Sequence, residues 1–238
     1  NNNIDDAIKF ANLASGVVVG KIGSATANKF LSEGCCVILT DIDKSALQSK
    51  HNEFVEKYGK DVVHSILMDV TSDKDVQSAV SESINQFGGI DILVANAGFA
   101  SVALFEKTST KLWDKNMDIL SKGCFLISRE VYQKMIEQNN GGSIIFVSSK
   151  NSLSASKGAS AYSVAKSSLL HLSRLIALEG STYKIRSNVV NPDAVIQGSK
   201  IWRGDWKKQR AISNKISINN VEEFYNCLLY TSPSPRDS

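Results

Sequence analysis

Short apolar runs alternate with longer amphipathic segments along this sequence, and no other feature constrains its fold as strongly. The apolar runs have the composition of buried β-strands, and they lie at residues 36–39, 62–68, 90–94 and 144–147. Helices are expected between and around them, at residues 24–33, 44–58, 72–87, 108–137 and 159–178. Strands joined by helices favour a parallel sheet with right-handed crossovers. The alternation therefore predicts a doubly wound α/β fold with helices on both faces of the sheet.

Composition restricts the partners that such a domain can have. The chain has 238 residues, 42% of them apolar, and a net charge of only +3. One sizeable core is therefore expected, and neither nucleic acid nor a membrane is indicated as a partner. The cysteines have no metal-ligand spacing, which argues against a metal site and for a reduced, cytoplasmic location. They are Cys35, Cys36, Cys124 and Cys227.

Three polar residues near one predicted strand and one predicted helix are suited to acid–base chemistry. Tyr162 and Lys166 are four apart in the helix expected at 159–178, so they share one helical face. An ammonium beside a phenol lowers the phenol's pKa from about 10, which makes a tyrosine usable as an acid or base near neutrality. Ser149 follows the strand at 144–147, at the edge where parallel sheets build their sites. Taken alone, such a spacing is weak evidence, because most such pairs are a half-buried ring beside a solvated amine.

The order of several short motifs resembles that of the short-chain dehydrogenase/reductase family. The motifs are Asp41 at a strand end, Asp69 with Val70, the turn Asn96, Ala97 and Gly98, Ser149, Tyr162 with Lys166, and Asn191 with Pro192. The resemblance implies a Rossmann-like fold and hydride transfer between a nicotinamide cofactor and a small alcohol or carbonyl compound. It also implies three catalytic residues. Tyr162 would exchange the proton, Lys166 would lower the tyrosine's pKa and hold the nicotinamide ribose, and Ser149 would hydrogen-bond the substrate oxygen.

An acidic residue at the end of the strand at 36–39 bears on the choice of cofactor. Asp41 follows Gly23 at about the spacing expected for a carboxylate that binds the adenosine ribose. A carboxylate there repels a 2′-phosphate, which favours NAD over NADP. The alternative is that Asp41 caps the next helix, a role for which Asp43 is the better candidate. By resemblance, the cofactor-binding residues are Gly20, Ile22, Gly23, Asp41, Asp69, Val70, Asn96, Ala97, Gly98, Tyr162, Lys166 and Pro192.

The segment at residues 1–22 departs from the family pattern. From Ala7 it reads as a helix-like stretch that runs into glycines and valines, where a first strand and a glycine turn should stand. The four anchor positions of that turn fall on Gly16, Val17, Lys21 and Gly23. The family has glycine at the last three of these positions, and only the final one, Gly23, is kept. Val17 and Lys21 therefore place side chains where the backbone should approach a phosphate. The segment resembles the closing helix of a ribokinase-type sugar kinase, which indicates a join between two genes; a divergent loop that uses Gly20 is the alternative.

The helix expected at 108–137 holds a second departure. Many family members have an asparagine three residues before the position of Gly123, where it relays a proton through water to the lysine; Leu120 stands there in this chain. Asn116 lies one turn earlier on the same face, where a surface or capping role fits as well as a catalytic one. No fourth catalytic residue is therefore assigned.

Residues 191–202 narrow the resemblance to a subgroup. With residues 116–120 and 149–151 they resemble the dehydrogenase half of bifunctional rhamnulose-1-phosphate aldolase/lactaldehyde dehydrogenase, including Asp193 where most relatives have glycine. This implies lactaldehyde or a related hydroxy-aldehyde or sugar as substrate, a role in rhamnose catabolism, and fusion to an aldolase domain in the full-length relative. Residues 197–206 would form a flap over the substrate, with an ordinary amphipathic helix as the alternative.

The segment at residues 227–238 is rich in serine and proline and resembles translated vector sequence. The expected organisation is a dehydrogenase domain at 23–226 between two atypical ends, with a fold truncated at both. An inactive fragment of such a dehydrogenase is the main alternative function. A sugar epimerase or dehydratase is a weaker one, because it needs a large C-terminal substrate domain. The family usually forms dimers or tetramers, so a homo-oligomer is also expected.

Overall fold

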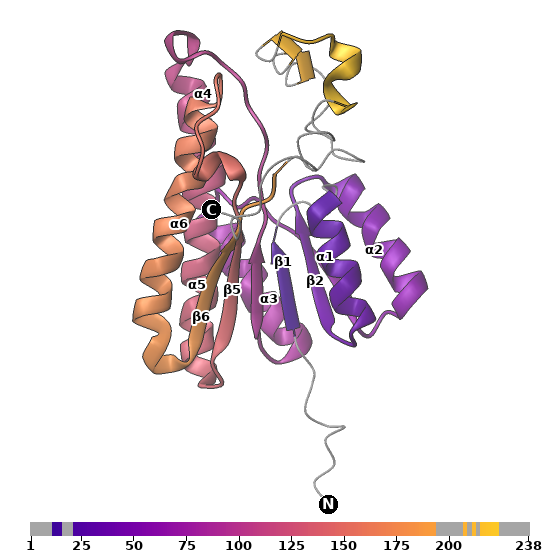
Figure 1. Cartoon of the computed structure of the whole chain (residues 1–238). Helices are drawn as coiled ribbons and strands as arrows, with labels where there is room; N and C mark the ends of the chain where they lie inside the picture. The colour runs from indigo at the N-terminus through magenta and orange to yellow at the C-terminus, as the bar shows by residue number, and fades with distance from the viewer. Residues whose placement is uncertain (1–10, 16–20, 194–206, 209–210, 213–214, 224–238) are drawn as a thin grey trace, which may run out of the picture.

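Six parallel strands form one sheet (Figure 1). The structure, a computed structural model, describes residues 11–15, 21–193, 207–208, 211–212 and 215–223. The strands are β1 (Ala11–Ser15), β2 (Cys36–Asp41), β3 (Val63–Leu67), β4 (Ile92–Ala95), β5 (Gly142–Val147) and β6 (Ile185–Val190). Their order is β3-β2-β1-β4-β5-β6. This order confirms the doubly wound, Rossmann-like α/β fold. Successive strands are added in one direction from β1 to β3 and in the other from β4 to β6, and such sheets bind ligands where this direction changes, between β1 and β4.

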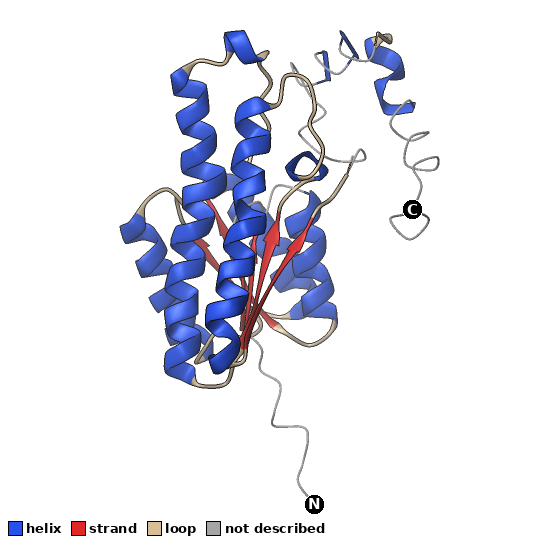
Figure 2. Cartoon of the chain, turned by 60° about the vertical axis from the view of Figure 1, so that its left-hand side comes forward, coloured by secondary structure: helices blue, strands red, loops and turns tan. Residues whose placement is uncertain are grey.

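The long helices cover the two faces of the sheet in two groups, so that the strands lie between helices (Figure 2). One face carries α1 (Lys21–Ser32) and α2 (Lys44–Tyr58), and the other carries α3 (Asp73–Phe87), α5 (Gly123–Gln138) and α6 (Ser160–Gly180). Side chains of β2 alternate between these faces. Val37 and Leu39 join the apolar cluster with α1 and α2, whereas Ile38 joins the larger cluster with α3, α5 and α6. Burial on both faces explains why β2 reads as a continuous apolar run.

β1 occupies the centre of the sheet. Its last residue, Ser15, lies opposite Thr40 of β2 on one side and opposite Ala95 of β4 on the other. The helix-like interpretation of residues 11–15 is therefore wrong, and the first strand is present. Backbone pairing with two neighbouring strands outweighs the modest local preference of alanine and leucine for a helix. α1 begins at Lys21, earlier than expected, so Ile22 and Gly23 belong to its first turn.

Residues 110–138 are helical without a break, close to the helix expected at 108–137, but a π-helical turn divides them into two α-helical parts. The region between β4 and β5 contains the 3-10 turn η2 (Phe105–Lys107), α4 (Thr110–Asn116), the π-helical turn η3 (Met117–Lys122) and then α5. π-Helical turns inside longer helices occur frequently at functional sites. The other short helices among the described residues are η4 (Lys150–Ser152), η5 (Ser181–Tyr183) and η7 (Ile218–Asn220).

Capping residues define the ends of α3 as predicted. The hydroxyl of Ser72 accepts a hydrogen bond from the backbone N–H of Asp75, and Gly88 ends the helix in the left-handed conformation. Within the part of the chain that the structure describes, none of the helices has the length and apolar character needed to span a bilayer.

Candidate active site

The carboxyl ends of the strands bring the predicted site residues to one edge of the sheet. β4, β5 and β6 end side by side, with Ala95 opposite Phe146 and Val147 opposite Val190. Asn96, Ser149 and Asn191 follow these strand ends directly or after one further residue. Doubly wound proteins bind their ligands at this edge. The fold therefore gathers motifs that are far apart in the sequence.

Tyr162 and Lys166 lie near the start of α6, on one helical face, with only 9% and 5% of their surfaces exposed. The Nζ atom of Lys166 donates a hydrogen bond to the carbonyl oxygen of Val147, 2.7 Å away. Burial lowers the pKa of Lys166 from its ordinary value of 10.5, while the neighbouring Cys124 thiol has the opposite, weaker effect. The predicted acid–base pair is thus a buried pair, and its lysine is attached to the end of β5.

Ser149 is held at the start of η4. Its backbone is extended, and its hydroxyl oxygen accepts a hydrogen bond from the N–H of Asn151 at 3.2 Å. A hydroxyl can accept one hydrogen bond and donate another, so Ser149 can still donate to a substrate oxygen. The preceding residue, Ser148, donates its own hydroxyl to the backbone carbonyl of Lys166 at 2.8 Å. This bond joins residues 148–152 (the serine loop) to α6 (the catalytic helix, named for its candidate residues Tyr162 and Lys166).

The turn at 96–98 lies directly against Lys166. A Cβ atom placed on Gly98 would stand 3.6 Å from the Nζ of Lys166 and 3.1 Å from the Cδ2 of Leu120. Leu120 is fully buried and clusters with Tyr162 and Ala165. The position where the family pattern has an asparagine therefore supplies an apolar wall beside the tyrosine.

Asn116 is fully buried at the end of α4. Its Oδ1 accepts a hydrogen bond from the Ser101 hydroxyl at 2.9 Å, and its Nδ2 donates to the carbonyl of Leu112 at 2.7 Å. The surface role considered for Asn116 is therefore wrong. Its side chain instead ties the loop after β4 to α4, and buried amides require such partners.

Asp41 ends β2 at the same edge of the sheet and is partly exposed. Its Oδ1 accepts the N–H of Asp43 at 2.9 Å, and Asp43 in turn accepts the N–H of Ala46 at 3.1 Å. Asp43 is thus the cap of α2, as predicted. Capping is therefore done by Asp43, and Asp41 stands at the strand end where a ribose-binding carboxylate was predicted.

Asp69 and Val70 follow β3. The Oδ1 of Asp69 accepts hydrogen bonds from the N–H of Thr71 at 2.8 Å and from its hydroxyl at 2.7 Å. Val70 is buried, and a Cβ atom on Gly123 would come within 2.8 Å of its Cγ2. Only glycine allows α5 to approach Val70 so closely, and this contact fixes the Asp69 turn against the helix.

The remaining predicted cofactor residues that the structure describes lie in two places. Ile22 and Gly23 lie in the first turn of α1, whose N-terminus follows the carboxyl end of β1 and has the polarity that attracts phosphate. Pro192 accepts the backbone N–H of Lys150 at 2.9 Å. Gly20 and the expected flap at 197–206 lie outside the described residues. The residues present therefore fit a dinucleotide, while none of the described His, Cys, Asp and Glu side chains form a group suited to a metal ion.

Two contacts near the catalytic helix had no signal in the sequence. Ala103 forms a single β-bridge with Ala159, and the hydroxyls of Thr108 and Ser160 lie 3.0 Å apart. Together they hold the loop after β4 against the start of α6, next to Tyr162. These residues are small, belong to no motif and are distant in sequence, so only the fold reveals their contact.

The strand order and the residues gathered at the carboxyl edge of the sheet are those of a Rossmann-type dinucleotide-binding domain. The family model described as "short chain dehydrogenase" matches residues 16–207. The chain belongs to this family of enzymes.

Among curated proteins, the "Uncharacterized oxidoreductase YuxG" of Bacillus subtilis (strain 168) is 46% identical over 206 residues. The match covers 87% of this chain but only 30% of that relative. Among solved structures, sorbitol-6-phosphate 2-dehydrogenase of Erwinia amylovora has a TM-score of 0.82 at 24% identity, covering 90% of this chain and 82% of that one, which shows the fold alone. An NAD+-bound xylitol dehydrogenase has a TM-score of 0.75 at 27% identity, covering 88% and 77% of the two chains.

Proposed function

We propose that this chain catalyses reversible hydride transfer between NAD and a small hydroxy-aldehyde, secondary alcohol or sugar. The observation that carries the proposal is the burial of Tyr162 and Lys166 on one face of α6, with Lys166 attached to the strand end that leads to Ser149. Three groups of complementary chemistry are thereby held at the ligand-binding edge of a doubly wound sheet.

Each of the three residues has one task in alcohol oxidation. The hydroxyl of Ser149 donates a hydrogen bond to the substrate oxygen and orients it. Tyr162 accepts the proton of the substrate hydroxyl, and the ammonium of Lys166 favours the phenolate that does so. Leu120 and Gly98 border this space. The nicotinamide, when bound, supplies the hydride acceptor.

NAD is proposed over NADP because of Asp41. Its carboxylate at the end of β2 can accept hydrogen bonds from the ribose hydroxyls and repels a 2′-phosphate. The similar xylitol dehydrogenase was solved with NAD+ bound, which supports this choice.

Lactaldehyde is the substrate that we propose within this class, with rhamnose catabolism as the setting. The support is the resemblance of residues 191–202, including Asp193 after Pro192, to the lactaldehyde dehydrogenase half of a bifunctional enzyme. The 46% identical relative is much longer than the matched segment, which spans 30% of it. That length agrees with a dehydrogenase joined to a further domain such as an aldolase.

A homo-oligomer is a further part of the proposal. α5 and α6 expose apolar side chains that a second copy could cover, among them Phe125, Leu175 and Leu178. Light scattering of the purified chain should give a mass larger than one chain, and a monomeric mass would remove this part of the proposal.

Cofactor titration tests the function most directly. Purified protein is titrated with NADH and, in parallel, NADPH while nicotinamide fluorescence is followed; saturable binding of NADH alone is expected. Turnover of lactaldehyde, measured as a change in NADH absorbance, should then be seen. Failure to bind either cofactor would identify the chain as an inactive fragment, whereas binding without turnover of any alcohol or aldehyde would contradict the catalytic assignment.

A further inference from the structure

An ion pair connects the serine loop to the segment that follows β6. The Nζ of Lys150 lies 2.8 Å from the Oδ2 of Asp193. Lys150 directly follows Ser149, and Asp193 directly follows Pro192. The pair therefore joins two stretches of chain that leave neighbouring parallel strands at the ligand-binding edge.

The ion pair is the outermost of several bonds between these two stretches. The N–H of Ser148 donates to the carbonyl of Val190 at 2.8 Å, and the N–H of Lys150 donates to that of Pro192 at 2.9 Å. The hydroxyl of Ser152 donates to the Oδ1 of Asn191 at 2.9 Å. Pairing of β5 with β6 is thus continued beyond the strands, with Ser149 in the middle of the bonded stretch.

The opposite side of the serine loop is held by the catalytic helix. Ser148 donates its hydroxyl to the carbonyl of Lys166 at 2.8 Å, and Ser167 donates its hydroxyl to the carbonyl of Ser152 at 2.9 Å. The position of Ser149 relative to Tyr162 is therefore determined by two anchors. α6 provides one, and the segment at 191–193 provides the other.

We propose that Lys150 and Asp193 act as a pair of positioning residues for Ser149, and through it for the substrate oxygen. This inference rests on the proposed function, in which Ser149 binds that oxygen. The ion pair restrains the residue next to Ser149, and enzymatic rates depend steeply on small displacements of an orienting group. Neither side chain needs to touch the substrate for this effect.

The size of the effect follows from the exposure of the pair. The side chains of Lys150 and Asp193 are 48% and 35% exposed, so solvent weakens their attraction. Loss of such a pair corresponds to a change of about two- to fivefold in an equilibrium or rate. Added salt should make the rates of wild type and of variants without the pair more similar, because the pair is accessible to counterions.

Kinetics on the full chain provide the first test. Lys150→Met and Asp193→Ala should each lower kcat for the alcohol about two- to fivefold, while the dissociation constant of NADH stays unchanged. The exchanged pair, Lys150→Asp with Asp193→Lys, should recover most of kcat, because it restores the ion pair. A loss of kcat caused by the absence of the original side chains themselves would not be recovered. Equal loss of NADH binding and kcat, or no recovery in the exchanged pair, would overturn the proposal.

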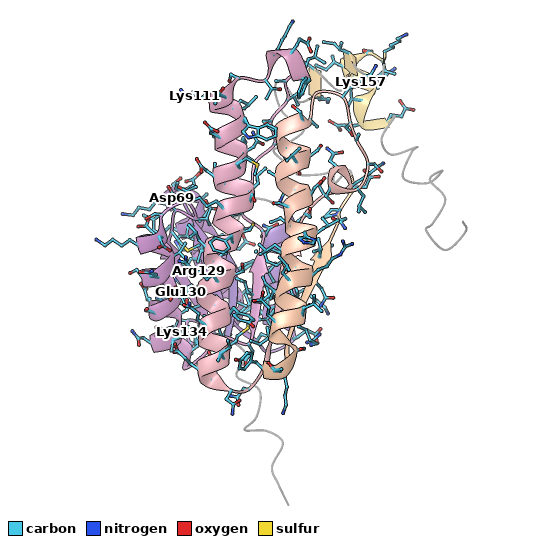
Figure 3. All side chains as sticks on the ribbon, turned by 90° about the vertical axis from the view of Figure 1, so that its left-hand side faces the viewer. Asp69, Lys111, Arg129, Glu130, Lys134 and Lys157 are labelled. Atoms are coloured by element: carbon cyan, nitrogen blue, oxygen red, sulfur yellow. The ribbon has the colours of Figure 1, made fainter. Side chains whose placement is uncertain are left out.

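Hydrogen exchange provides a test that does not depend on turnover. The amide protons of Lys150 and Asn151 are hydrogen-bonded in the wild-type chain, and Asp193→Ala should make both exchange faster by about the same factor as kcat falls. Glu137→Gln is the matched control, because it breaks a similarly exposed pair with Lys134. Lys157 belongs to the loop between η4 and α6. Figure 3 shows that Lys134, on α5, lies far from it. Unchanged exchange at 150 and 151 would overturn the positioning role, whereas absence of turnover in the wild type would count against the proposed function alone.

Discussion

The ammonium nitrogen of Lys166 lies 2.7 Å from the carbonyl oxygen of Val147, the last residue of β5. The backbone carbonyl of the same lysine accepts the hydroxyl of Ser148, the next residue along the chain. α6 and the strand that leads to Ser149 are thus joined twice at one residue. This arrangement holds the three groups proposed to act in catalysis in fixed relative positions, and it makes several outcomes testable.

Removal of the Tyr162 hydroxyl should abolish the reaction without affecting the fold. Tyr162→Phe keeps the ring that packs with Leu120 and Ala165, so NADH binding and thermal stability should stay close to wild type. The rate should fall by about 10²- to 10⁴-fold, the usual contribution of a general acid or base. Steady-state kinetics and fluorescence titration on the same preparation measure both quantities, and retained turnover would exclude Tyr162 as the proton acceptor.

Lys166 should make stability depend on pH in the alkaline range. Because burial lowers its pKa from 10.5, the unfolded chain binds more protons than the folded one between the native pKa and 10.5. Stability should therefore rise with pH across that interval. In Lys166→Met this rise should be missing.

Urea unfolding of both proteins at several alkaline pH values gives the comparison. Cys124 acts in the opposite sense above pH 9.0, since burial raises the pKa of its thiol, but it is present in both proteins and its effect largely cancels. If the free energy of unfolding depends on pH in the same way in wild type and Lys166→Met, burial does not disfavour the charged form of Lys166.

Cofactor selectivity should depend on Asp41 and not on Asp43. Asp41→Ala removes the charge that repels a 2′-phosphate, so the ratio of NAD to NADP affinity should fall on the order of tenfold, or ~1.4 kcal/mol. Asp43→Ala removes the α2 cap and should cost about 1 kcal/mol of stability while leaving selectivity intact. Titrations with both cofactors decide the matter, and equal selectivity in wild type and Asp41→Ala would refute the ribose role.

Gly123 should tolerate no side chain while Val70 is present. In Gly123→Ala the new methyl group would lie 2.8 Å from the Cγ2 of Val70, and such overpacking costs about 1–3 kcal/mol, more than the helix gains from alanine. Adding Val70→Ala should recover part of the loss, which appears as coupling in a double-mutant cycle of unfolding free energies. A Gly123→Ala protein more stable than wild type would contradict the close contact.

The sequence reveals those parts of the structure that depend on local pattern. The strand at 144–147 and the helix around Tyr162 follow from apolar runs and periodicity, and the caps at Ser72 and Asp43 follow from residue type. The motif order was sufficient to indicate the family. Most of these motifs follow strand ends, which the topology brings to one edge of the sheet.

Features that depend on non-local pairing were not predictable. Residues 11–15 are a strand because β2 and β4 lie on both sides of them, which no local pattern shows. Asn116 is buried because Ser101, on a different element, supplies its partner. The π-helical turn at Met117–Lys122 likewise has no signature in composition.

The central place of β1 also determines how the domain can assemble. In the described sheet, β1 is the strand that connects the half formed by β2 and β3 to the half formed by β4, β5 and β6. Asn12 pairs with Val37 on one side and with Ile92 on the other, so the second pairing closes a much longer chain loop and costs more entropy. The half with β2 should therefore form around β1 first, and docking of the half that carries Tyr162 and Lys166 should be the slow folding step. A dinucleotide that contacts both halves would then lower the rate of unfolding, because it would slow the separation of the two halves that β1 connects.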